Sequence, residues 1–105
     1  NLFHGTVSAP GEVTLDGGRR LAVPAGAPAG QRVGLLMRPE RFAAGGINRF
    51  AGAVVESVYL GTAFKLRLAC DDGLELLVRQ PARGPLPAPG ARLEVAIDPD
   101  AIHVF

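Results

Sequence analysis

The feature that most constrains this chain is an internal repeat carried by three sequence blocks. NLFHGTV at residues 1–7 matches NRFAGAV at 48–54, an offset of 47. GRRLAV at 18–23 matches GLELLV at 73–78, an offset of 55, and GQRVGLLMRPE at 30–40 matches GARLEVAIDPD at 90–100, an offset of 60. Three matches in the same order predict a duplication, with one pseudo-repeat at residues 1–42 and the other at 48–105. The growing offset predicts two insertions in the second repeat, near ESVYLGTA and in the proline-rich stretch PARGPLPAPG.

Short apolar runs between glycines and prolines predict an all-β chain. Nine prolines and fourteen glycines leave no room for a long helix, because proline breaks helices and each apolar run ends within about eight residues. Alternation is clearest in FKLRLA, residues 64–69, where the apolar side chains would face one side and Lys65 and Arg67 the other. The stretches DGG at 16–18 and DDG at 71–73 are typical of tight hairpins, because their residues tolerate positive φ.

The length of 105 residues fits one domain with a single modest core. Each repeat alone is close to the size at which a core becomes marginal, so we expect the two to bury their apolar faces against one another. A chain of this length with many short strands suits an OB-fold-like small barrel, or a pair of half-barrels that exchange strands.

The charge pattern argues against a nucleic-acid-binding protein. Eleven basic and ten acidic residues give a net charge of +1, and the basic residues are spread along the chain. Tyr59, Phe64 and Lys65 could stack on and neutralise a single strand, but six aromatic residues in the whole chain make a poor platform. We therefore expect Phe64 to belong to the core and nucleic acid not to be a partner.

Metal and acid/base sites are also weakly supported. His4 and His103 lie at opposite ends of the chain, and Cys70 is the single thiol, so a zinc site would lack ligands with suitable spacing. Asp98 and Asp100 could form an acid/base pair, but Pro99 between them favours a turn. The sequence predicts no catalytic residue, no metal site and no bound cofactor in this chain.

The motif Arg38-Pro39-Glu40 follows an apolar strand and has three interpretations. Pro39 fixes φ and removes a backbone donor, so the strand must end or lie at an edge there. Arg38 could then make forked hydrogen bonds and Glu40 could accept them, either at a structural corner between the repeats, at a contact with another domain or subunit, or at a ligand. The second repeat has Asp98-Pro99-Asp100 here, which keeps the turn but loses the arginine.

Most of the chain resembles a known family. The stretches NRFAGAV, YLGTAFKLRL, DDGLELLV, VGLLMRPERF and PGARLEVAIDPDAIHVF are similar to the TOBE (transport-associated OB) domain at the C-terminus of ATP-binding subunits of bacterial ABC importers. The stretches YLGTAFKLRL and RPERF most resemble subunits of the polyamine class, which import spermidine and putrescine, while ferric iron, phosphonate and sugar importers remain open. The resemblance implies a single TOBE-type domain over residues 1–105, with an N-terminal ATPase domain missing upstream.

The same resemblance implies a role that depends on other proteins. The parent would be a transport ATPase that binds ATP and Mg²⁺, couples hydrolysis to a membrane permease, and lies in the cytoplasm at the inner face of the membrane. The domain itself would hold two copies of the subunit together and would not be an enzyme, because it has no phosphate-binding loop. The expected contact residues are Arg38 and Glu40 beside Pro39, Tyr59 and Gly61 in the insertion, and Asn48 as a strand-capping hydrogen bonder.

A second resemblance supplies the alternative function. Small doubled OB-like modules that bind molybdate have a similar Asn-x-x-x-Gly-x-Val start, and oxyanions favour exposed backbone N–H groups. Those modules end their last strand with a lysine-serine type of sequence, whereas this chain has Arg-Pro-Glu and Asp-Pro-Asp. Binding of molybdate or a similar oxyanion is therefore the alternative.

Overall fold

A computed structural model describes all 105 residues and confirms the all-β class. It has nine strands: β1 Leu2–Ala9, β2 Glu12–Leu15, β3 Arg20–Ala22, β4 Arg32–Met37, β5 Asn48–Tyr59, β6 Ala63–Cys70, β7 Glu75–Pro81, β8 Arg92–Ile97 and β9 Ile102–Val104. The helical segments are two single 3₁₀ turns, η1 Pro39–Arg41 and η2 Pro99–Ala101. No helix is long and apolar enough to span a bilayer.

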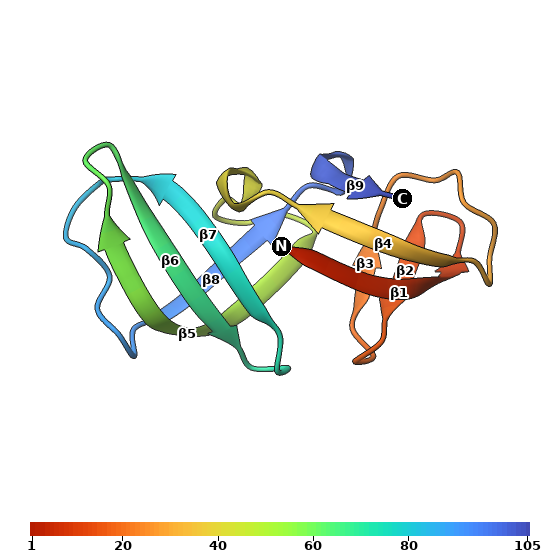
Figure 1. The fold of residues 1–105 in the computed structure, drawn as a ribbon, viewed down its shortest axis with the longest axis horizontal. Helices are drawn as coiled ribbons and strands as arrows, with labels where there is room; N and C mark the ends of the chain where they lie inside the picture. The colour runs from red at the N-terminus through yellow and green to blue at the C-terminus, as the bar shows by residue number, and fades with distance from the viewer.

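The strands form two curled antiparallel sheets that lie side by side along a molecule 44 Å long (Figure 1). The first sheet has the order β3-β2-β1-β4-β9 and the second has the order β7-β6-β5-β8. In both halves four strands are followed by a 3₁₀ turn, so β1–β4 with η1 corresponds to β5–β8 with η2. This arrangement confirms the predicted OB-like fold built from two pseudo-repeats.

The two halves exchange the segments that follow their 3₁₀ turns. β9 comes from the second repeat but pairs with β4 of the first sheet, where Leu36 lies opposite His103. Ala43 comes from the first repeat but forms a bridge with Ala96 of β8 in the second sheet. The two pairs are equivalent, because Leu36 corresponds to Ala96 and Ala43 corresponds to His103 at the offset of 60. The exchange is therefore reciprocal, and each sheet includes a segment from the other repeat.

The first predicted insertion lengthens a hairpin. Both halves have a register shift at the equivalent place, between Val7 and Ala9 in β1 and between Val54 and Glu56 in β5. After that point the first hairpin turns immediately, whereas β5 and β6 continue for two further pairs beyond Glu56 and Ser57 before they turn. The second insertion is the β7–β8 loop, residues 82–91.

One core serves both halves. Nineteen buried residues form a continuous apolar cluster with members in both sheets. Phe42, which follows η1 in the first repeat, packs edge-on against Phe50 of β5 with ring centroids 6.0 Å apart. The halves therefore bury their apolar faces together, as small half-barrels must.

An equivalent glycine in each half lets two strands come close. A Cβ at Gly5 would clash with the carbonyl oxygen of Thr14, and a Cβ at Gly52 would clash with the carbonyl oxygen of Ala69. Each glycine lies on the first strand of its half at the offset of 47, next to the backbone of the neighbouring strand. The duplicated Gly-x-Val pattern is thus a packing requirement of each half-barrel.

Candidate functional site

The junction between the halves is held by a buried asparagine. The side chain of Asn48 accepts a hydrogen bond from the N–H of Ala22 at 2.8 Å and donates to the C=O of Ala22 at 2.8 Å. It also donates to the C=O of Ile97 at 3.1 Å. Asn48 is 4% exposed and is the single buried polar side chain of the core, so each of these bonds replaces a lost contact with water.

Asn1 repeats this arrangement in the other direction. Its side chain accepts from the N–H of Leu77 at 2.6 Å and donates to the C=O groups of Leu77 and Met37, both at 2.9 Å. The partners follow the three sequence offsets, because Asn1 and Asn48 differ by 47, Ala22 and Leu77 by 55, and Met37 and Ile97 by 60. We call these two side chains the asparagine clasp.

The asparagine clasp has a clear physical effect. Each amide links the end of the last strand in its own half to the edge strand of the other half, which is β3 or β7. A carboxamide can bond both the N–H and the C=O of one backbone residue. Each clasp asparagine therefore satisfies backbone groups on the outer edge of an edge strand, where no neighbouring strand is present.

A second duplicated contact fixes the hairpin turns. Arg32 forms a two-pronged pair with Asp16, with distances of 2.5 and 3.1 Å, and Arg92 forms the same pair with Asp71, with distances of 2.8 and 2.5 Å. The hydrogen bonds from these arginines lower the pKa of both aspartates. All four side chains are exposed, so the pairs orient the turns more than they stabilise the fold.

Arg19 makes a contact between the halves that is not duplicated. Its guanidinium donates to Asp72 at 2.7 Å and lies 4.3 Å from the centre of the Phe50 ring, both in the other half. Leu74 takes the equivalent position in the second repeat. Arg19 and Asp72 line an open hollow of about 250 Å³, and because the carboxylate already neutralises the arginine, an anion gains little there.

Cys70 lies beside this hollow at the end of β6. Burial, followed by the neighbouring Asp72 carboxylate, raises the pKa of the thiol to about 11. The thiol is therefore protonated at neutral pH and is a packed core residue rather than a nucleophile.

The longer β5–β6 hairpin carries the largest group of exposed apolar side chains. Nine large hydrophobic residues are exposed in the chain, and five of them lie on this hairpin or beside it: Val55, Val58, Tyr59, Leu60 and Leu77. First-half strands contribute only Leu2 to the set, so the exposed apolar side chains on strands are concentrated in the second half.

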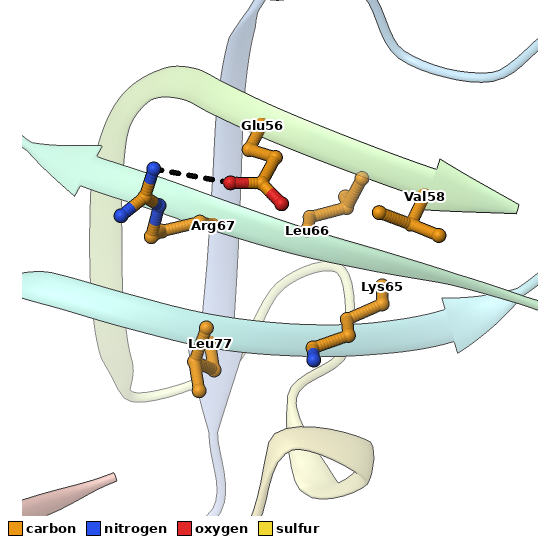
Figure 2. A pocket seen from close by; sticks show the side chains of 6 residues that line it. All are labelled: Glu56, Val58, Lys65, Leu66, Arg67 and Leu77. Atoms are coloured by element: carbon orange, nitrogen blue, oxygen red, sulfur yellow. Dashed lines mark hydrogen bonds and ion pairs between the residues drawn. The ribbon is translucent and has the colours of Figure 1, made fainter.

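Figure 2 shows a hollow of about 210 Å³ on the outer side of β5, β6 and β7. It is lined by Glu56, Val58, Lys65, Leu66, Arg67 and Leu77. Arg67 lies between two carboxylates, 3.1 Å from Glu56 and 3.4 Å from Glu75. Lys65 has no carboxylate within ion-pair distance, and its side chain extends over β7 (Figure 2).

Comparison with known families identifies the architecture. The sequence model of the TOBE domain family matches residues 35–105, which is more than half of the chain. The chain belongs to the TOBE domain family. In this TOBE domain the matched region includes the end of β4, η1 and the whole second half.

Two known proteins are similar to this TOBE domain over its full length. The sn-glycerol-3-phosphate import ATP-binding protein UgpC of Chromobacterium violaceum is 36% identical over 114 aligned positions, which cover 100% of the chain and 29% of UgpC. The chain thus spans less than a third of that relative. The cytoplasmic molybdate-binding protein ModG, in a crystal form with molybdate bound, superposes with a TM-score of 0.80 at 19% identity, over 99% of this chain and 94% of that one. The likeness to ModG shows that the fold is shared.

The Arg-Pro-Glu corner of the TOBE domain is formed by its backbone. The N–H of Arg41 donates to the C=O of Arg38 at 3.0 Å, and Pro39 begins the 3₁₀ turn. The side chains of Arg38 and Glu40 make no hydrogen bond or ion pair within the chain, so their forked contact stays a prediction about another surface. In the second corner Asp98 instead accepts a hydrogen bond from the N–H of Asp100 at 2.8 Å, which caps the turn from within.

The predicted contact residues fall in three separate places. Pro39 and Glu40 lie on η1, which packs against β7, and Arg38 directly precedes it, while Asn48 lies at the junction. Tyr59 and Gly61 lie at the hairpin tip, where Gly61 has φ +90 in a turn closed by a 2.8 Å bond from the Leu60 N–H to the Ala63 C=O. They do not form one site, and no three His, Cys, Asp or Glu residues come together as a metal site requires.

Sequence reasoning did not single out Asn1, Arg19 or the outer side of β6 and β7. The signal for Asn1 was present, because it aligns with Asn48 in the first repeat block. Arg19 had no such signal, since its partners Phe50 and Asp72 are distant in the sequence and the second repeat has Leu74 in its place.

Proposed function

We propose that this chain is the regulatory and dimerisation domain of the ATP-binding subunit of a bacterial ABC importer. The observation that carries the proposal is the 36% identity to UgpC, an import ATP-binding protein, along the whole of this chain. The match to the TOBE domain family supports the same assignment. The parent subunit would bind ATP and Mg²⁺ in its remaining part and would couple ATP hydrolysis to solute import.

The geometry of the chain fits a binding module rather than an ATPase. A phosphate-binding loop needs backbone N–H groups at the start of a helix and a following lysine. Lys65 instead lies in the middle of an antiparallel strand, opposite Val58 and Arg79. The reciprocal strand exchange and the asparagine clasp make the two halves one body, which suits a domain that transmits contacts between larger partners.

The proposed partners are a second copy of the subunit, the subunit's own ATPase domain and, through it, the membrane permease. The proposed location is therefore the cytoplasm, at the inner face of the membrane. The exposed charges of Arg38 and Glu40, which have no partner within the chain, are suited to one of these contacts.

The imported solute stays a prediction with two candidate classes. The resemblance of YLGTAFKLRL and RPERF to polyamine importers favours spermidine or putrescine, whereas the named relative UgpC favours sn-glycerol 3-phosphate. ATPase activity of the reconstituted transporter, measured with the binding protein loaded with each solute, would separate the two classes. Stimulation by only one of them would assign the solute.

The sequence of the source gene upstream of the Asn1 codon tests the proposal directly. We expect codons for a Gly-x-x-x-x-Gly-Lys-Ser/Thr loop and for the rest of an ABC ATPase domain. A start codon immediately before Asn1 would overturn the proposal.

Oxyanion binding is the second candidate, because ModG shares the fold along nearly the whole chain. Thermal unfolding of the chain in increasing molybdate would test it, since a ligand that binds only the folded state raises the midpoint. A midpoint that rises with molybdate but not with sulfate would favour this candidate. An unchanged midpoint would exclude it.

A further inference from the structure

Most unpaired positive charges of the chain lie on β6 and β7 or on segments next to them. Five of the eleven basic residues form ion pairs, namely Arg19, Arg32, Arg49, Arg67 and Arg92. Of the six others, all but Arg20 lie on β6, on β7, on η1 or directly before it, or in the loop after β7. We call the outer side of β6 and β7, together with the adjoining η1, the basic face, with Lys65, Arg79, Arg38 and Arg41 as its cations.

The basic face keeps two cations in an arrangement that costs stability. Lys65 and Arg79 lie directly opposite each other on β6 and β7. Like charges in that position repel, and neither has a carboxylate within ion-pair distance. The nearby Glu56 and Glu75 are already held by Arg67. The face therefore has a surplus of positive charge that the chain itself does not neutralise.

Apolar groups border the same cations. Val58 and Leu77 are 40% and 39% exposed on either side of β6, and the hollow between them is open to solvent (Figure 2). An apolar side chain can enter this hollow while Lys65 and Arg79 meet carboxylates beside it. Apolar anchors surrounded by complementary charge are typical of protein docking surfaces.

We propose that the basic face is the docking surface for an acidic segment of a partner protein, anchored by an apolar side chain in the hollow of Figure 2. The face has no aromatic platform for bases, which disfavours a single-stranded nucleic acid. Glu40, Glu56 and Glu75 are interspersed among the cations, which suits a peptide of mixed side chains better than a uniformly anionic bilayer. The inference rests on the proposed function in one respect, since a regulatory domain needs a surface that a regulator can recognise.

The test is binding of a short fluorescein-labelled peptide of alternating glutamate and leucine to the chain, followed by fluorescence anisotropy. We expect Arg79→Glu to weaken binding by about tenfold or more, because it places like charge against the ligand. The matched control is Arg20→Glu, which makes the same charge change at an unpaired, exposed arginine on the other pinned edge strand, β3. We expect it to change affinity by less than about twofold.

Several results would overturn the proposal. These are no binding of the peptide, equal losses in the two variants, or equally tight binding of a lysine–leucine peptide or of single-stranded DNA. Sedimentation that shows self-association abolished by Arg79→Glu would assign the face to a second molecule of this chain instead. Failure here would leave the proposed function standing, because the gene sequence upstream of Asn1 tests that function independently.

Discussion

The two half-barrels share the contacts that hold the fold and differ in the surfaces they show. The close-approach glycine, the clasp asparagine and the Arg–Asp fork at the hairpin turn occur once in each half, at the offsets found in the sequence. The exposed apolar hairpin, the basic face and the Arg19 contact occur once in the molecule. Duplicated contacts therefore identify what the architecture requires, and unduplicated ones identify where the halves have diverged.

The largest expected effect comes from the close-approach glycines. Gly52→Ala should lower the free energy of unfolding by about 3 kcal/mol and Gly5→Ala by about 2 kcal/mol, because the new methyl group meets a backbone oxygen that cannot move aside. Urea unfolding measures both. Gly17→Ala is the control, since nothing lies within 4 Å of a Cβ there. Equal stability of all three variants would show that the two halves are not packed as described.

The asparagine clasp should come next. Asn48→Ala removes three hydrogen bonds to backbone groups at a buried position, so we expect a loss of about 2 kcal/mol. Asn1→Ala removes the equivalent bonds where water can replace them, and we expect about 1 kcal/mol. Amide hydrogen exchange should show faster exchange at Ala22 in the first variant and at Leu77 in the second. The opposite assignment would contradict the crossed arrangement.

Arg19 tests a contact found in one half only. Arg19→Met should cost about 1 kcal/mol, because it removes a partly exposed ion pair and a cation above the Phe50 ring. Asp72→Asn and the double variant complete a thermodynamic cycle. Additive losses would mean that Arg19 and Asp72 do not stabilise each other across the junction.

We expect the smallest effect from removing the aspartates of the two Arg–Asp forks, which make the stability of the chain sensitive to low pH. The two forks should contribute equally. The pKa values of Asp16 and Asp71 are lower in the folded chain than in the unfolded one, so their stabilisation is present above the unfolded pKa and is lost as the pH falls through the folded pKa. The window therefore lies below about pH 4. Asp16→Asn and Asp71→Asn should each flatten the pH dependence of the unfolding midpoint by a similar amount. A change in only one variant would show that the two forks are not equivalent.

Much of the architecture could be predicted because the sequence contains the same pattern in two pseudo-repeats. The three repeat blocks, the alternation in FKLRLA and the turn residues each reflect a local backbone preference, and the structure confirms the two half-barrels that they predict. The corner at Pro39 was predictable for the same reason, since proline acts on its own residue and its neighbours.

The contacts between the halves were not predictable from local preference. The sequence predicts that Asn48 caps a strand, but it does not predict the partner. The hydrogen bonds to Ala22 form because the tertiary structure brings the two residues together. The basic face exists because some cations have no carboxylate close enough to form an ion pair. Such distances depend on the tertiary structure and cannot be predicted from the positions of the charges in the sequence. The forked contacts expected of Arg38 and Glu40 stay a prediction about another surface, because both side chains are exposed and make no hydrogen bond or ion pair within the chain.

Strand exchange and the asparagine clasp make the two halves a single folding unit. Differential scanning calorimetry of the chain and of Asn48→Ala tests this claim most directly. We expect one transition in both proteins, at a lower temperature in the variant, with a calorimetric enthalpy equal to the van't Hoff enthalpy. Two separable transitions in the unmodified chain, or a variant in which only one half melts earlier, would contradict it.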